Sequence, residues 1–112
     1  MKKKYIIKKN YHIQKIIFAR KSVSNKYFIV FTLDNSLDYF RFVVSIGKKV
    51  GKAVVRNKIK RQIKALIYQN KYKIKKNYDI LIIVRPSIIS LKYLAIEENL
   101  TDILRKANLI SE

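Results

Sequence analysis

The residues best suited to chemistry in this sequence are the basic residues that lie between two glycines and in the segment after them. Residues 47–61 read GKKVGKAVVRNKIKR, and Lys64 extends the series. Arg56 and Arg61 carry guanidinium groups that can donate two hydrogen bonds to one phosphate, whereas a lysine acts as a point charge. Asn57 both donates and accepts, so it can contact sugars or base edges. This pattern predicts a surface that binds the backbone of a nucleic acid.

Other chemistry has little support in the sequence. The chain has no cysteine, which excludes disulfides, thiol catalysis and thiolate metal sites. His12, the single histidine, has no carboxylate close to it in sequence and is expected to be an exposed helix residue. The seven carboxylates do not form the converging set of a two-metal nuclease, and Asp79 is expected to pair with a nearby lysine. We therefore expect no catalytic residue, metal or cofactor bound by this chain.

The distribution of charge supports a polyanionic partner. The 112 residues include 26 basic and 7 acidic ones, a formal net charge of +19. Residues 1–33 hold nine basic residues and no acid, residues 39–78 hold thirteen and no acid, and residues 79–112 hold four basic and five acidic residues. A uniform bias towards lysine would not leave two long segments without acids. Nucleic acid is therefore favoured over a membrane surface or a purely compositional effect.

Hydrophobic periodicity predicts the elements that position these residues. In chain order, the expected elements are a helix capped by Asn10, strands over 27–33 and 40–46, a helix over 53–69, a strand over 78–84 and a helix around 96–107. The first two strands alternate in polarity and flank the turn residues 34–36, so they are expected to form a hairpin. The general rule for crossovers predicts a right-handed connection from 40–46 through the helix to 78–84.

The chain is expected to be one α+β domain over residues 1–112, an α/β sandwich whose basic residues 1–9 form a flexible arm. The apolar segment 5–7 is too short for a secretory signal, and no uncharged stretch approaches the ~18–20 residues that span a bilayer. We expect a cytoplasmic protein without a membrane partner.

Residues 47–61 closely resemble the signature of the bacterial ribonuclease P protein family: paired lysines, a glycine, an Ala-Val step, an Arg-Asn-Lys run and a closing Lys-Arg. The resemblance extends to the lysine-rich start, the aromatic strand at 27–33, the segment 78–86 and the final helix. It implies an accessory subunit of an endoribonuclease, whose RNA subunit and Mg²⁺ hydrolyse precursor tRNA at the 5′ end. It also implies a fold like domain 2 of ribosomal protein S5, with an unusual left-handed βαβ crossover.

The resemblance implies two binding sites and no obligate protein partner. The catalytic RNA is expected to contact Lys48, Lys49, Lys52, Arg56, Asn57, Lys58, Lys60, Arg61 and Lys64. The 5′ leader of precursor tRNA is expected in a cleft at Ile13, Ile17 and Phe31, with Tyr27 and Phe28 as weaker candidates. The family usually carries aromatic residues where Ile13 and Ile17 stand, and isoleucine has no π face on which a base could stack.

Two alternatives remain open from the sequence. A ribosomal or generic RNA-binding protein would carry the same charge pattern, but it would not restore precursor-tRNA processing to a catalytic RNA. A protein-only nuclease would need clustered carboxylates, which the sequence does not offer.

Overall fold

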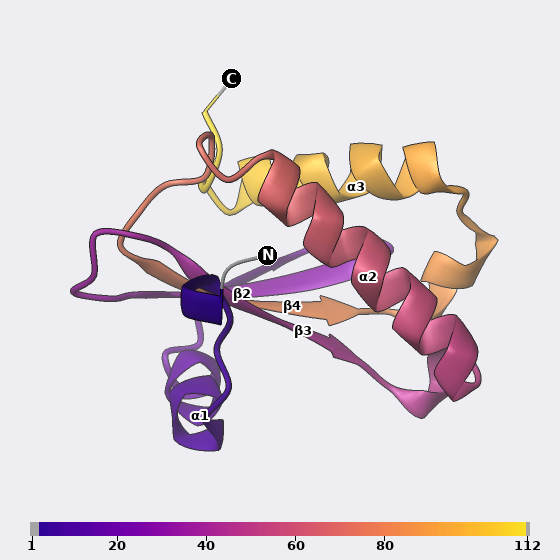
Figure 1. Ribbon diagram of the computed structural model, residues 1–112, viewed down its shortest axis with the longest axis horizontal. Helices are drawn as coiled ribbons and strands as arrows, with labels where there is room; N and C mark the ends of the chain where they lie inside the picture. The colour runs from indigo at the N-terminus through magenta and orange to yellow at the C-terminus, as the bar shows by residue number, and fades with distance from the viewer. Residues whose placement is uncertain (1–2, 112) are drawn as a thin grey trace.

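The computed structural model describes residues 3–111 as a mixed four-stranded sheet with helices on both faces (Figure 1). In chain order, the elements are η1 (Lys3–Tyr5), α1 (Asn10–Phe18), β1 (Ser22–Ser24), β2 (Phe28–Asp34), β3 (Arg41–Ile46), η2 (Lys48–Val50), α2 (Ala53–Gln69), β4 (Tyr78–Val84), η3 (Pro86–Ser90) and α3 (Tyr93–Lys106). The predicted single α+β domain and its order of main elements are confirmed. Asn10 is the first residue of α1, and Lys9 takes the N-cap position without a side-chain capping bond. No helix in the described part of the chain is long and apolar enough to cross a membrane.

The pairing of the strands differs from the predicted hairpin. The strand order is β1-β2-β4-β3, with β2 antiparallel to β4 and β3 parallel to β4. The two strands that were expected to pair therefore lie on either side of β4. A central strand is covered on both faces, which explains why β4 is almost entirely apolar. The hairpin prediction relied on the tendency of consecutive strands to be neighbours, and that tendency fails here.

The connection from β3 through α2 to β4 links two parallel neighbours. Figure 1 shows it as left-handed, with α2 crossing over the sheet between strands that both point to the right. The right-handed expectation is therefore wrong, and the hand implied by the family resemblance is correct. With this hand α2 packs over β3 and beside α3, while α3 covers β1 and β2. The outer face of α2 is left towards solvent.

The two faces of the sheet are covered unequally. One face carries the main core, which includes Phe28, Val30, Phe42, Ile80 and Ile82 from the strands and Ile63, Ile67, Leu100 and Ile103 from α2 and α3. The opposite face carries a smaller cluster of Ile7, Ile16 and Leu81, with Ile13, Phe31, Leu33, Val43 and Ile83 partly buried against it. Because side chains alternate along a strand, adjacent residues of β2 belong to different faces. The face beside α1 is thus only partly covered.

The residues before α1 are docked against the sheet. Ile7 is 3% exposed and its amide donates to the carbonyl of Phe42 at 2.9 Å. Ile6 forms a parallel bridge with the same residue. The expectation of a flexible arm over 1–9 is therefore not met by residues 3–7, because their short apolar run extends the sheet edge beside β3. Residues 1 and 2 lie outside the described residues.

Candidate nucleic-acid interface

The orientation of α2 about its own axis determines which of its side chains face solvent. Ile59, Ile63, Leu66 and Ile67 are buried along one side of the helix, as its periodicity predicts. Val55, expected on the same stripe, is half-buried near the beginning of the helix. The remaining arc of α2 faces away from the sheet and carries most of its charge.

The predicted RNA-binding residues all lie outside the core. We call them together the α2 basic surface: Lys48, Lys49, Lys52, Arg56, Asn57, Lys58, Lys60, Arg61 and Lys64. Arg56 and Lys64 are half-buried and the other seven are exposed. Within residues 3–111, the ion pair closer than 4.0 Å is Arg41–Asp79, which includes no member of this surface. Its charges are therefore available to an external polyanion.

The entrance to α2 holds Arg56 in place. The Nε of Arg56 donates to the carbonyl of Gly51 at 3.1 Å, so the side chain folds back over the η2 loop. Gly51 has φ = 156°, and a Cβ there would lie 3.3 Å from Cβ and Cγ1 of Val55. Glycine is thus needed for both the backbone angle and the close approach of the helix. The terminal nitrogens of Arg56 remain positioned to donate to phosphate oxygens.

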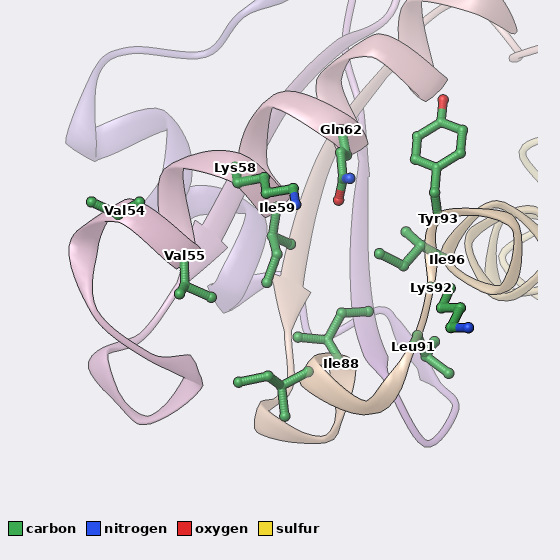
Figure 2. A pocket seen from close by; sticks show the side chains of 11 residues that line it. Val54, Val55, Lys58, Ile59, Gln62, Ile88, Leu91, Lys92, Tyr93 and Ile96 are labelled. Atoms are coloured by element: carbon green, nitrogen blue, oxygen red, sulfur yellow. The ribbon is translucent and has the colours of Figure 1, made fainter.

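The α2 basic surface wraps around the helix. At ~100° per residue, Arg56 and Lys58 lie about 200° apart around the axis. Lys58 is on the rim of an apolar pocket of about 500 Å³ between α2, η3 and α3 (Figure 2). Ile59 and Ile96 approach each other across this pocket from the two helices. A flat surface cannot touch both edges of the arc, so this arrangement suits a partner with a grooved surface.

The proposed leader site falls on the partly covered face of the sheet. Ile13 of α1 and Phe31 of β2 pack against the same small cluster, so the structure brings these two predicted residues together. Val43 and Ile83 continue the apolar surface across β3 and β4. Ile17 is 38% exposed, so it meets solvent and is not part of the buried cluster.

The two weaker leader candidates do not join this face. Phe28 is fully buried, with 0% exposure, in the main core on the opposite side of the sheet. Its prediction as a leader-binding residue is wrong, because the alternation of β2 directs it towards α2 and α3. Tyr27 precedes the strand and is half-buried against that same core.

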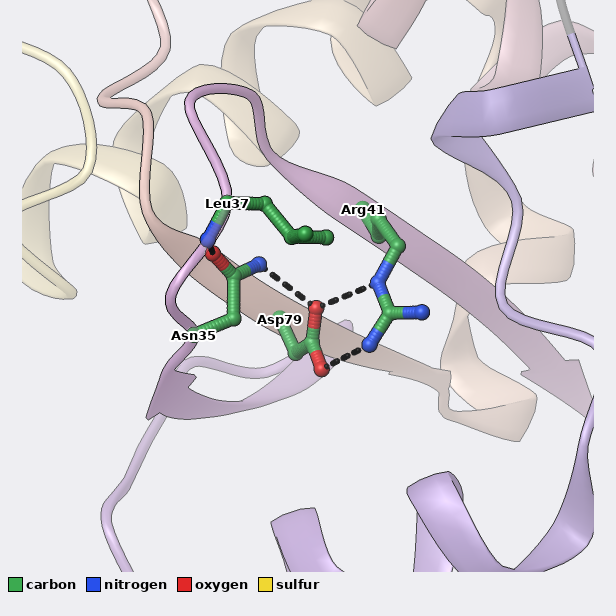
Figure 3. A network of polar contacts seen from close by, with 4 residues as sticks. All are labelled: Asn35, Leu37, Arg41 and Asp79. Carbon is green, nitrogen blue, oxygen red and sulfur yellow. Dashed lines mark hydrogen bonds and ion pairs between the residues drawn. The ribbon is translucent and has the colours of Figure 1, made fainter.

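A polar network at one end of the sheet is structural. Asp79 is 5% exposed and accepts hydrogen bonds from Nε and Nη2 of Arg41 at 2.9 and 2.7 Å, and from Nδ2 of Asn35 at 2.8 Å (Figure 3). The bond to this carboxylate raises the pKa of Arg41. Asn35 also accepts from the amide of Leu37 at 2.9 Å, which ties the loop after β2 to the network. The expected lysine partner of Asp79 is thus replaced by an arginine that faces it across β3 and β4.

Side chains that could hold a metal do not cluster in the described part of the chain. Residues 3–111 contain no group of three or more His, Asp or Glu side chains that could hold an ion. His12 is half-buried instead of exposed, and its ring centroid lies 4.2 Å from that of Tyr11. The described residues therefore do not fit a metal site.

Comparison with known sequences gives a consistent picture. The Ribonuclease P family model matches residues 1–108. A "Ribonuclease P protein component" from Mycoplasma mycoides subsp. mycoides SC is 41% identical over 107 residues, covering 95% of this chain and 98% of that protein. A protein of the same description from Geobacillus kaustophilus is 40% identical over 108 residues, covering 96% of this chain and 89% of that protein.

Solved structures agree with the sequence comparison. An RNase P protein mutant from Staphylococcus aureus, described as defective in mRNA degradation activity, superposes with a TM-score of 0.92 at 38% identity and covers 96% of this chain and 92% of its own. The RNase P protein from Thermotoga maritima gives a TM-score of 0.83 at 30% identity, covering 89% of this chain and 94% of its own. Sequence, fold and basic surface lead to one conclusion: the chain belongs to the ribonuclease P protein family.

Proposed function

We propose that the chain uses the α2 basic surface to bind the catalytic RNA of ribonuclease P, and the sheet face beside α1 to bind the 5′ leader of precursor tRNA. Membership of the family makes it a component of an endoribonuclease that processes tRNA. The observation that carries the proposal is the gathering of nine cationic or amide side chains on the solvent side of α2 and η2, with no ion pair to any of them within residues 3–111.

The role of the α2 basic surface is electrostatic and positional. Two RNA molecules that approach each other repel, and cations bound between them lower that repulsion while releasing condensed counterions. Arg56 and Arg61 can grip phosphates in a fixed fork, whereas the lysines contribute charge with less directional demand. Asn57 is exposed among these cations and can hydrogen-bond a sugar or a base edge.

The leader would lie on the partly covered sheet face. Single-stranded RNA is recognised by its unstacked bases, and Phe31 supplies an aromatic ring on this face. Ile13 adds apolar contact without a π face, so we expect a looser grip there than an aromatic residue would give. The leader would therefore be held chiefly by Phe31 and by the attraction between its phosphates and the positive charge of the protein.

The hydrolysis itself is assigned to the RNA subunit and its Mg²⁺ ions. The protein's acids serve structure where their partners are known, as Asp79 does with Arg41. This chain contributes no group to the cleavage of the bond. Its contribution is to bring catalytic RNA and substrate together and to hold the leader.

Reconstitution with the catalytic RNA tests this function. Cleavage of precursor tRNA is measured at low Mg²⁺, with a substrate that carries a leader of several nucleotides and one that carries a single nucleotide. The protein is expected to restore cleavage, and more strongly for the longer leader. Phe31→Ala should reduce the advantage of the longer leader, whereas Arg105→Ala on α3 serves as the control.

Two results would contradict the proposal. Failure to restore cleavage, together with tight binding to unrelated structured RNA, would indicate a generic RNA-binding protein. Equal stimulation of the cleavage of both substrates would show that the protein has no leader site, although it still binds the catalytic RNA.

A further inference from the structure

A second cationic and aromatic site lies beyond the C-terminal end of α2. It is a pocket of about 390 Å³ formed by η1, the residues just before β3 and the loop that follows α2. Its lining includes three tyrosines and three lysines: Tyr5, Tyr39, Tyr72, Lys4, Lys71 and Lys76. Asp38 is the acid on its rim, so the pocket carries a net positive charge.

The aromatic wall of this pocket is anchored in the core. The ring of Tyr5 lies 5.0 Å from that of Phe40, which is 3% exposed, and meets Tyr39 edge-on at 6.1 Å. Tyr72, which also lines the pocket, is 90% exposed. One side is therefore preorganised, and the ring of Tyr72 is accessible to a ligand.

The lysines of the pocket are held close to these rings. The Nζ of Lys4 lies 4.9 Å from the ring centroid of Tyr39, and the Nζ of Lys71 lies 5.1 Å from that of Tyr72. A hydrogen bond with Tyr68 raises the pKa of Lys71, which keeps this ammonium charged. Neither lysine belongs to the ion pair found within residues 3–111.

The pocket is continuous with the α2 basic surface. Lys60, Lys64 and Tyr68 are spaced four residues apart, so they follow one side of the helix. The Nζ of Lys71 lies 3.7 Å from the ring centroid of Tyr68 and carries the positive charge beyond the helix end. An RNA seated on α2 can thus extend to the pocket, about 25 Å along a 17-residue helix.

Flat aromatic rings beside cations match the two parts of an unpaired nucleotide, a base that stacks and a phosphate that carries charge. We propose that this pocket binds an unpaired nucleotide of the RNA that lies on the α2 basic surface. The inference rests on the proposed function, since it assumes that RNA occupies α2. The RNA is either the catalytic RNA or the precursor tRNA bound beside it, and the test separates these two.

The test uses Tyr72→Ala and Tyr72→Phe in the full-length chain. Affinity is measured for the catalytic RNA alone, and for precursor tRNA with the assembled holoenzyme. Tyr72→Ala should lose about 5- to 100-fold in affinity for one of the two RNAs, since a base loses its stacking partner. Tyr72→Phe keeps the ring and should stay within about twofold of the unmodified protein. The RNA that Tyr72→Ala binds more weakly is the ligand of the pocket.

Leu94→Ala, which removes an exposed side chain at the beginning of α3, is the control and should bind both RNAs normally. Unchanged affinity of Tyr72→Ala for both RNAs would overturn the inference, as would an equal loss in Tyr72→Phe or in the control. Arg56→Ala is measured in parallel. If Arg56→Ala weakens binding and Tyr72→Ala does not, this inference fails alone; if neither weakens binding, the proposed function fails as well.

A cross-linking measurement gives an independent reading. With p-benzoylphenylalanine in place of Tyr72, irradiation of the holoenzyme with precursor tRNA should yield cross-links to an unpaired nucleotide. Cross-links confined to base-paired segments would contradict the proposal.

Discussion

At the scale of single residues, Arg56 shows how a loop prepares a phosphate contact. Its Nε is taken by the carbonyl of Gly51 at 3.1 Å, and the side chain is half-buried. Part of the entropy cost of ordering an arginine is therefore met before RNA binds. The same hydrogen bond restrains the remaining guanidinium donors. A lysine at this position would carry the positive charge but would lack the fixed arrangement of guanidinium donors.

Replacement of Arg56 tests that reasoning. Arg56→Ala should weaken binding to the catalytic RNA by ~1–3 kcal/mol, the scale of a charged hydrogen bond. Arg56→Lys should recover only part of the loss, because the bidentate fork is missing. Filter binding at low and high salt measures both, with Arg105→Ala as an equal change of charge on α3. An Arg56→Ala variant that binds normally at both salt concentrations would contradict the role.

Asp79 is important for stability and not for RNA contact. Asp79→Asn removes the charge from a group that accepts bonds from Arg41 and Asn35. Arg41 keeps some contact with water, at 20% side-chain exposure, so the expected destabilisation is about 2 kcal/mol, below that of a fully buried pair. Urea unfolding measures it. An unchanged unfolding midpoint would show that the network adds no stability, and a large loss of RNA affinity in folded protein would show a second role.

At the scale of elements, the sequence predicts what depends on local pattern. The ranges of α2 and β4 agree with their predicted limits, because long runs of periodic or continuous apolar residues leave little ambiguity. Pairing between strands is non-local, and the expected hairpin was wrong. The partner of Asp79 was missed for the same reason, since Arg41 faces it only in the parallel register of β3 and β4.

The exposure of side chains along a single element was predicted better than the assembly of residues from several elements. The α2 basic surface follows from helical spacing and from the family signature, and all of its residues are accessible. The leader site required knowledge of which face each β2 residue occupies. Phe31 and Phe28 differ by three positions and therefore point to opposite faces of the sheet.

The entrance of α2 can be tested as an element. Gly51→Ala should destabilise the protein by about 1–3 kcal/mol, because φ = 156° disfavours a side chain and the new Cβ presses on Val55. Gly47→Ala is the control, since a Cβ there meets no atom within 4 Å. Thermal unfolding of both variants gives the comparison. Equal stability of the two would mean that the glycine is not required by the backbone.

At the scale of the whole molecule, repulsion between positive charges opposes the compact fold. A net charge of +19 within a radius of gyration of 13.1 Å repels itself, and added salt should screen that repulsion. The melting temperature of the free protein should therefore rise between low and moderate sodium chloride. Differential scanning calorimetry measures it. A melting temperature that falls with salt would indicate that attractive charge pairs dominate.

The salt dependence of binding to the catalytic RNA tests the central claim most directly. If the unmodified protein neutralises about six phosphates, the slope of log affinity against log salt should be about −5. The triple variant Lys60→Gln, Arg61→Gln, Lys64→Gln should lower the magnitude of that slope by about 2 to 3. The matched variant Arg20→Gln, Lys21→Gln, Lys106→Gln, with the same loss of charge around a pocket at the end of α3, should change it by less than about 1. Equal changes in the two variants would mean that RNA responds to net charge alone and that the α2 basic surface is not its binding site.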